Sequence, residues 1–456
     1  MVDLARIQFA TTTLYHFLFV PLTLGLGPLV AIMQTLWHRT GNEAWLRLTR
    51  FFGTLFLINF AIGVATGLVQ EFEFGMNWSV YAKFVGNVFG APLAIEGLAA
   101  FMLEATFLGI WIFGWNRLPP RVHLATLWIA VLGTWLSAYF ILVANSWMQH
   151  PVGYKIVNGQ AQLTSVWALL SNGFALRAYV HTILAGLIFG SIVMLGICCW
   201  HFLRDHDVDL YRRAAKLALF VAVPVTLLQL AVGNRFGEAV TSAQSMKIAA
   251  SEAQWDTCQP CGFSLFQLGG FTEQDQKPKF AITVPRVLSY MATGSFSGKV
   301  EGLKQLQAQE ERRSGPGNYM PNVRVIYWSM RVMAYAGVLM FLVAALGAWL
   351  YWKRRLEPAR WFHRTAIVAM ALPYIAASAG WVLTEMGRQP WIVQGLLLTS
   401  KANSPSVSAT WVAISLAFFV ALYVALGVTD FVLMRRYARP DRPTPQEELP
   451  VPAATY

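Results

Sequence analysis

Long apolar runs alternate with short polar segments along almost the whole chain. Nine of these runs are close to the roughly 20 residues that a helix needs to cross a bilayer. They span residues 12–36, 52–70, 91–114, 122–147, 179–203, 214–233, 325–352, 365–385 and 409–434. The pattern predicts an all-α polytopic membrane protein with about nine transmembrane helices. The first run is too long for a cleaved signal peptide, and no small-residue cleavage site follows it.

One polar segment is much longer than the others and is rich in Gln, Gly and Pro. It covers residues 234–324, between the sixth and seventh apolar runs. We therefore divide the chain into residues 1–233 with helices one to six, a long extracytoplasmic loop at 234–324, residues 325–435 with helices seven to nine, and a cytoplasmic tail at 436–456.

Composition supports a membrane protein, and the basic residues predict its orientation. Only 13% of the residues are charged, about half the fraction that is usual in soluble domains. In the short loops, 18 Lys and Arg residues fall on one side and six on the other. Because basic loops face the cytoplasm, the N-terminus is expected outside and the C-terminus inside. The net charge of +12 is then explained by these loops rather than by nucleic-acid binding.

Several polar or sulfur-bearing side chains lie inside the predicted spans at a similar depth, in the outer half of the membrane. They are His16, His181, Met333, Glu96 and Glu385. A charged group inside a span costs about 2.5–3.5 kcal/mol on insertion scales, which makes it a functional hypothesis by default. A His and a Met suit the two axial positions of a low-spin electron-transfer haem. A His or Glu with an open opposite face suits a haem that binds dioxygen.

Each of these residues also has a structural interpretation. A single intramembrane His is often only a hydrogen-bonded core residue, and Met333 alone is more often core packing than a ligand. Glu385 and Arg388 can form an interfacial ion pair. Glu104 lies about 12 Å deeper than Glu96 and within about 80° of it on a regular helix. That placement suits a proton relay and equally a pair of interhelical hydrogen bonds, so the shared depth is what favours function.

Motifs spread over nearly the whole chain carry a family resemblance. They are "RIQFATTTLYHFLFVPLTLG" (6–25), "LINFAIGVATGLVQEFEFGMNWS" (57–79), "FGAPLAIEGLAAFMLEATF" (89–107), "GWNRLP" (114–119), "VANSWMQHPVG" (143–153), "VHT" (180–182), "KIAASEAQWDT" (247–257), "YWSMRVM" (327–333) and "GWVLTEMGRQPW" (380–391). With these motifs the chain resembles subunit I of the cytochrome bd-type quinol oxidases. The length of its outer loop is similar to that of the short-loop, actinobacterial-like form.

The resemblance implies three haems and their ligands. His181 and Met333 match the axial ligands of a low-spin haem b. His16 and Glu385 match the ligands of two active-site haems, a high-spin haem b and a haem d. Members of the family differ in which of these two residues holds which haem, so that choice stays open. Some short-loop members use haem b in place of haem d, and that choice also stays open.

Other matched positions surround these ligands. Glu96 matches a residue beside the haem pair, and Glu104 matches a member of a proton path from the cytoplasm. Trp381 matches an aromatic side chain between the haems, and Arg388 completes the last motif. Arg331, two residues before Met333, is expected to pair with a haem propionate.

The outer loop holds two more pairs of interest. Lys247 and Glu252 match residues linked to quinol oxidation. Cys258 and Cys261 lie outside, where an oxidising compartment permits a disulfide. A CxxC motif can also bind a metal, but a metal site would want a second pair or nearby histidines, and none is there.

The resemblance implies a bacterial cytoplasmic-membrane enzyme that oxidises quinol outside and reduces dioxygen to water with cytoplasmic protons, so generating proton motive force. It requires a second large subunit, subunit II, and leaves the small single-helix subunits and the choice between menaquinol and ubiquinol open. A different class is a proton-coupled transporter that uses the same intramembrane acids. Transporters usually show paired halves with broken helices, and no such halves are evident here.

Overall fold

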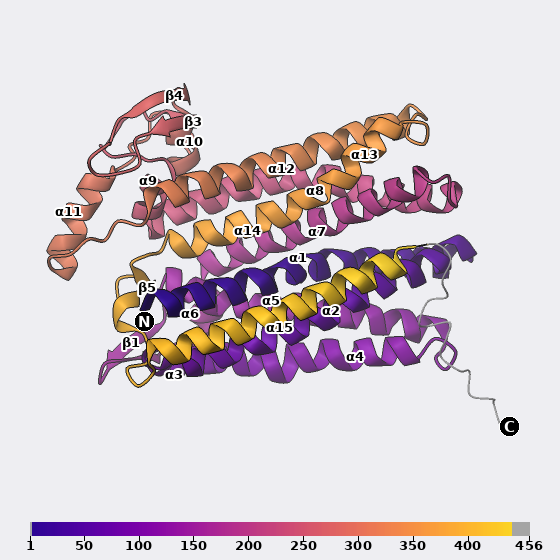
Figure 1. Ribbon diagram of the computed structural model, residues 1–456, viewed down its shortest axis with the longest axis horizontal. Helices are drawn as coiled ribbons and strands as arrows, with labels where there is room; N and C mark the ends of the chain where they lie inside the picture. Colours follow the sequence, from indigo (N-terminus) through magenta and orange to yellow (C-terminus); the bar gives the residue numbers. More distant parts are fainter. Residues whose placement is uncertain (1, 440–456) are drawn as a thin grey trace.

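The computed structural model of the protein describes residues 2–439 and consists mainly of long helices that lie side by side (Figure 1). Among the described residues, nine helical spans of 27–39 residues are long and apolar enough to cross a membrane. The predicted fold class, an all-α polytopic membrane protein, is confirmed. The last part of the predicted tail lies outside the described residues.

The spans follow the order of the apolar runs. They are α1 (Val2–Thr40), α2 (Glu43–Met76), the continuous α3 (Ser79–Ile95), η1 (Glu96–Phe101) and α4 (Met102–Phe113), α5 (Pro120–Gln149), α6 (Val166–Leu170) with α7 (Gly173–Phe202), α8 (Val208–Ala243), α12 (Val323–Trp352), α13 (Arg360–Ala369) with α14 (Ala371–Met386), and α15 (Ala409–Tyr437).

Most helices extend beyond the apolar runs that predicted them, because a helix continues past the hydrocarbon layer into polar sequence. The sixth span, α8, ends at Ala243, so the long loop begins about ten residues later than the predicted boundary at 233/234. Local caps fix several other ends. Asn172 and Asn322 accept backbone hydrogen bonds at the starts of α7 and α12, as expected for N-cap residues.

The long loop and the shorter connections at the same end form a small polar layer, which we call the loop end of the bundle (Figure 1). The long loop contains α9 (Ser245–Ser251), β3 (Phe263–Gly269), β4 (Pro278–Val284), α10 (Val287–Thr293) and α11 (Leu303–Ser314). The shorter connections contain β1 (Tyr154–Val157), β2 (Gln160–Leu163), β5 (Trp391–Val393), β6 (Leu397–Leu398) and η2 (Thr399–Lys401). Each strand pair is an antiparallel two-stranded sheet.

Cys258 and Cys261 are joined by a disulfide in the long loop, as the sequence predicts. Cys261 is buried in a small apolar cluster with Leu288, Ala292 and Val300. The disulfide closes a tight turn before β3, and the packing of Cys261 places that turn against α10 and the chain that leads into α11.

The two most buried spans, the ones containing α1 and α7, cross at three glycines. A Cβ on Gly25 would lie 1.8 Å from the Gly186 carbonyl oxygen, and one on Gly190 would lie 2.6 Å from the Gly25 carbonyl carbon. Because lipid supplies little hydrophobic drive for helix association, small residues that let backbones approach closely are a main source of packing in membranes. The core of the bundle is built around this crossing.

We expect the substitution Gly25→Ala to lower the melting temperature of the detergent-solubilised protein clearly, because the added methyl cannot fit without separating α1 and α7. Gly90→Ala on α3 is the matched control, since a Cβ there meets no atom within 4 Å. Size-exclusion chromatography after heating measures the melting temperature of each variant. Equal melting temperatures for the two variants would contradict this view of the core.

Candidate functional site

An ion pair stands at the loop end of α14. Arg388 Nη2 donates to Glu385 Oε2, and Asn145 Nδ2 of α5 donates to Glu385 Oε1 over 2.9 Å. Arg388 is only 4% exposed, yet its Nε and Nη1 atoms have no hydrogen-bond partner among the described residues. Unpaired buried donors are costly. They suit an anionic group, and a haem propionate is one that a guanidinium binds well.

Two residues that sequence reasoning missed connect this ion pair to the long loop. Gln149, the last residue of α5, accepts a 2.7 Å hydrogen bond from Lys247 Nζ and donates a 2.8 Å hydrogen bond to Asn145 Oδ1. Lys247 of α9 is buried as well. The motif "VANSWMQHPVG" held the signal: two amide side chains, Asn145 and Gln149, stand one helical turn apart at the end of a span.

A second buried ion pair lies between the loop and α12. Arg331, 1% exposed, places its Nη2 atom 2.7 Å from Glu252 Oε2. Its Nε and Nη2 atoms also donate to the Ser264 carbonyl, at 3.1 and 2.6 Å. The guanidinium carbon lies 3.7 Å from the centre of the Tyr327 ring. All three guanidinium nitrogens of Arg331 thus contact protein groups, and its expected contact with a haem propionate stays a prediction.

Burial changes the acidity of both loop residues. It lowers the pKa of the Lys247 ammonium to about 7, helped by the Arg388 guanidinium and opposed by Glu385. It raises the pKa of the Glu252 carboxyl to about 7, although Arg331 acts in the opposite direction. Both groups therefore titrate close to neutral pH. Strongly shifted groups of this kind concentrate at functional sites.

His16 of α1 lies beside α2. Its Nδ1 atom is 2.9 Å from Thr66 Oγ1, and a Cβ on Gly67 would lie 3.0 Å from His16 Cε1. The next residue, Phe17, stacks on Trp381 of α14 with ring centres 5.0 Å apart. The fold therefore brings the His16 region of α1 against the helix that carries Glu385 one turn beyond Trp381.

His181 and Met333 have a similar arrangement. His181 of α7 lies beside Gln229 of α8, whose side chain donates to the His181 carbonyl over 3.1 Å. A Cβ on Gly233 would lie 3.6 Å from the His181 ring, and one on Gly380 would lie 3.0 Å from Met333 Sδ. Three of the four predicted ligands thus have a glycine against them on a neighbouring helix. A side chain at these three positions would contact the predicted ligand, so the glycines leave room for the ligand side chains themselves.

The two acids of the third span face α5 through an irregular helical turn. Glu96 opens the π-helical segment η1, and Ser137 Oγ of α5 donates to Glu96 Oε1 over 2.7 Å. Glu104 lies against Gly133 of α5, where an added Cβ would be 2.7 Å from the Glu104 backbone nitrogen. The acids do share one face, but a π-helical turn separates them instead of the regular helix that the sequence suggested. Such turns are frequent at functional sites.

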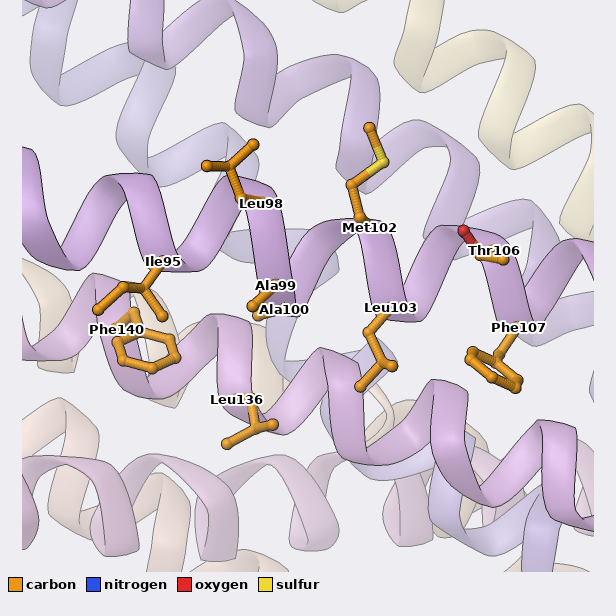
Figure 2. Close-up of a pocket in the computed structure, with 10 residues that line it drawn as sticks. All are labelled: Ile95, Leu98, Ala99, Ala100, Met102, Leu103, Thr106, Phe107, Leu136 and Phe140. Atoms are coloured by element: carbon orange, nitrogen blue, oxygen red, sulfur yellow. The ribbon is translucent and has the colours of Figure 1, made fainter.

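A largely apolar groove of about 560 Å³ lies along the same stretch of α3, η1 and α4. Figure 2 shows Leu103 and Phe107 pointing toward α5, which carries Leu136 and Phe140, while Leu98 and Met102 point away from α5. Neither Glu96 nor Glu104 lines the groove. The groove is therefore a surface feature of this hairpin, and the acids lie in its interior.

Two histidines, a methionine and a carboxylate thus lie on four different spans, and Arg388 has two donors without a partner among the described residues. Such a set of side chains in a membrane protein would suit haem groups. A family model described as "Cytochrome bd terminal oxidase subunit I" matches residues 4–442. The chain belongs to this family, and the family implies haem cofactors.

Curated relatives and a solved structure agree with the family. The chain is 44% identical to cytochrome bd ubiquinol oxidase subunit 1 of Bacillus subtilis (strain 168), over 93% of this chain and 90% of the relative. It is 36% identical to cytochrome bd-II ubiquinol oxidase subunit 1 of Escherichia coli (strain K12), over 99% and 98%. The structure of the bd oxidase from Geobacillus thermodenitrificans matches with a TM-score of 0.87 and 27% identity, over 97% of this chain and 99% of that one.

The proposed axial methionine can be tested by spectroscopy. Met333→Leu keeps the side-chain volume and removes the thioether, so we expect loss or a change of spin state of the low-spin haem b signal, with the other haems retained. Met340→Leu, two turns further along α12 and buried in the core, is the control. An unchanged low-spin band in Met333→Leu would refute the assignment.

Proposed function

We propose that this chain is the haem-bearing subunit of a terminal quinol oxidase that oxidises quinol at the outer membrane face and reduces dioxygen to water. One observation carries the proposal. Loop residues Lys247 and Glu252 are buried against α14 and α12, which carry Glu385 and Met333, two of the proposed haem ligands. A quinol-oxidation site in the loop would thus adjoin the residues that would hold the haems.

Glu252 and Lys247 have complementary roles in quinol oxidation. Glu252 accepts a proton from a quinol hydroxyl, and Lys247 donates a hydrogen bond to a quinol oxygen. As pH rises through about 7, Glu252 gains the capacity to accept a proton while Lys247 loses its charge. Quinol oxidation should therefore be most efficient near neutral pH. The relatives are named for ubiquinol and, in one case, menaquinol, and either quinol suits these two groups.

Four side chains would hold the haems. His181 and Met333 suit a low-spin haem b, and His16 and Glu385 suit a high-spin haem b and a haem d, with a further haem b as the alternative to haem d. When bound, the haems carry the electrons of quinol and bind dioxygen. Arg388 supports this arrangement in two ways: it balances the charge of Glu385 and offers two free donors to a propionate. Trp381, stacked on Phe17, supplies an aromatic wall between α1 and α14.

Protons for water formation would come from the cytoplasm through Glu104 and Glu96. Glu104 lies deeper than Glu96 from the loop end of the bundle, and one Glu104 carboxylate oxygen is buried without a partner among the described residues. The basic connections fall at the end opposite the loop, and the positive-inside rule makes that end cytoplasmic. Releasing quinol protons outside and taking protons from inside would move charge across the bacterial cytoplasmic membrane without a pump.

The chain would act with a second large subunit, subunit II, and with small single-helix subunits. Large apolar side chains remain exposed on neighbouring spans, among them Leu98 at 79% and Phe72 at 71%. Exposed apolar patches of this extent mark contacts with membrane lipid or with other subunits.

The quinol site can be tested by comparing two electron donors. We expect Glu252→Ala and Lys247→Ala to reduce quinol-driven oxygen uptake at least tenfold, because the proton acceptor or the hydrogen-bond donor is lost. An artificial one-electron donor should still support uptake. Glu301→Ala and Lys304→Ala, at solvent-accessible positions in the same loop, are the controls. If both donors fail equally, or neither does, the loop is not the quinol site.

The proton route can be tested at Glu104. We expect Glu104→Gln to slow oxygen reduction while the haem content stays largely intact, because an amide cannot relay a proton as a carboxyl does. Charge movement across proteoliposome membranes after an oxygen pulse measures the step directly. Glu43→Gln, at the start of α2, is the control. Full turnover with full charge movement in Glu104→Gln would rule out this route.

A further inference from the structure

A chain of buried hydrogen bonds links the long loop to the end of α14. Lys247 Nζ donates to Gln149 Oε1 over 2.7 Å, and Gln149 Nε2 donates to Asn145 Oδ1 over 2.8 Å. Asn145 Nδ2 then donates to Glu385 Oε1 over 2.9 Å. Two neutral amides on one turn of α5 thus connect a lysine and a glutamate from two other segments.

The two ends force the direction of this chain. An ammonium group can only donate hydrogen bonds and an ionised carboxylate can only accept them. Gln149 must therefore turn its oxygen toward Lys247, and Asn145 must turn its amide nitrogen toward Glu385. The dipoles of both amides then align from the cation to the anion. Aligned hydrogen bonds in a low-dielectric interior polarise and strengthen one another.

Burial keeps water away from the Lys247–Gln149 and Gln149–Asn145 links, while the link to Glu385 is partly buried. Gln149 is 3% exposed, and Lys247 and Asn145 are buried as well. Loss of one buried partner leaves the others unsatisfied, which costs more than the hydrogen bond itself contributes. A change at one end should therefore be transmitted to the other.

We propose that Gln149 is a positioning residue that couples Lys247 in the quinol loop to Glu385 at the active-site haems. The inference rests on the proposed function, since it means that quinol binding at Lys247 changes the hydrogen bonding of Glu385. A quinol oxygen that takes a hydrogen bond from Lys247 competes with Gln149 for the same ammonium group. The Gln149 and Asn145 amides then hold Glu385 less firmly, while Arg388 stays on its other oxygen. No proton needs to pass through the amides.

The charged groups that act on Lys247 from neighbouring segments are Arg388, which lowers its pKa, and Glu385, which raises it. The Gln149 oxygen stabilises the ammonium form further. Gln149→Met keeps the length of the side chain and removes both amide atoms, so the Lys247 pKa should fall. Gln149→Glu places a negative charge beside Lys247, so the pKa should rise. A purely structural role for Gln149 would not move the pH profile in opposite directions.

The experiment uses the purified, assembled oxidase with its haem content measured in every variant. Gln149→Met and Lys247→Met should each shift the midpoint potential of an active-site haem to more negative values, because each removes the positive end of the chain from Glu385. The double variant should shift it no further than either single one. Gln149→Met should also raise the quinol KM about tenfold, because Lys247 loses the partner that positions it and stabilises its ammonium form, and this loss outweighs the loss of a competitor. The limb of the KM–pH profile that reports deprotonation of Lys247 should move to lower pH in Gln149→Met and to higher pH in Gln149→Glu.

Gln244→Met is the matched control. Gln244 is also a buried glutamine, three residues before Lys247, and it donates to Gln394 instead of joining the chain. The proposal is overturned if Gln149→Met leaves both the potential and the KM at their original values, or if the shifts of Gln149→Met and Lys247→Met add. Should Gln149→Met not assemble, Gln149→Glu and Lys247→Met decide the matter alone. If Lys247→Met shifts the potential but not the quinol KM, the coupling stands and the quinol assignment falls.

Discussion

Charged side chains that are cut off from water must find partners, and at the loop end of this bundle the partners come from several different segments. Glu252 of the loop meets Arg331 of α12, Arg388 meets Glu385, and Lys247 reaches the amides of α5. Isolated buried charges would be very costly. Satisfying them therefore fixes how α5, α9, α12 and α14 stand relative to one another, and the rest of the site depends on that arrangement.

The same constraint explains why a soluble-looking loop is part of a membrane site. Removing one partner of a buried ion pair leaves an uncompensated charge. The loop thus cannot leave the Glu252–Arg331 pair or the Lys247–Gln149 contact without a penalty. The two residues proposed for quinol are in this way held against helices that carry proposed haem ligands, although they lie in a polar loop between two spans.

Deeper in the bundle, close backbone packing at glycines, rather than ion pairs, holds the helices together. The glycine crossing of α1 and α7 fixes the centre, and the contact of Glu104 with Gly133 brings the third span against α5. Single glycines also face His16, His181 and Met333. Close backbone approach thus joins helices at the centre and places a glycine beside each of these three predicted ligands.

The sequence alone determined the number and order of the spans. A membrane helix forms its backbone hydrogen bonds within itself, so a local apolar run is enough to predict it. Its motifs also determined the family and the candidate ligands. What it could not determine were contacts between segments far apart in the chain. The spacing of Asn145 and Gln149 marks two amides on one helix face, but not their partners, because Lys247 and Glu385 lie about 100 and 240 residues away. Only the folded loop showed that Arg331 pairs with Glu252 and donates to the Ser264 carbonyl. The π-helical turn that begins at Glu96 was equally invisible, because no local pattern in the sequence marked it.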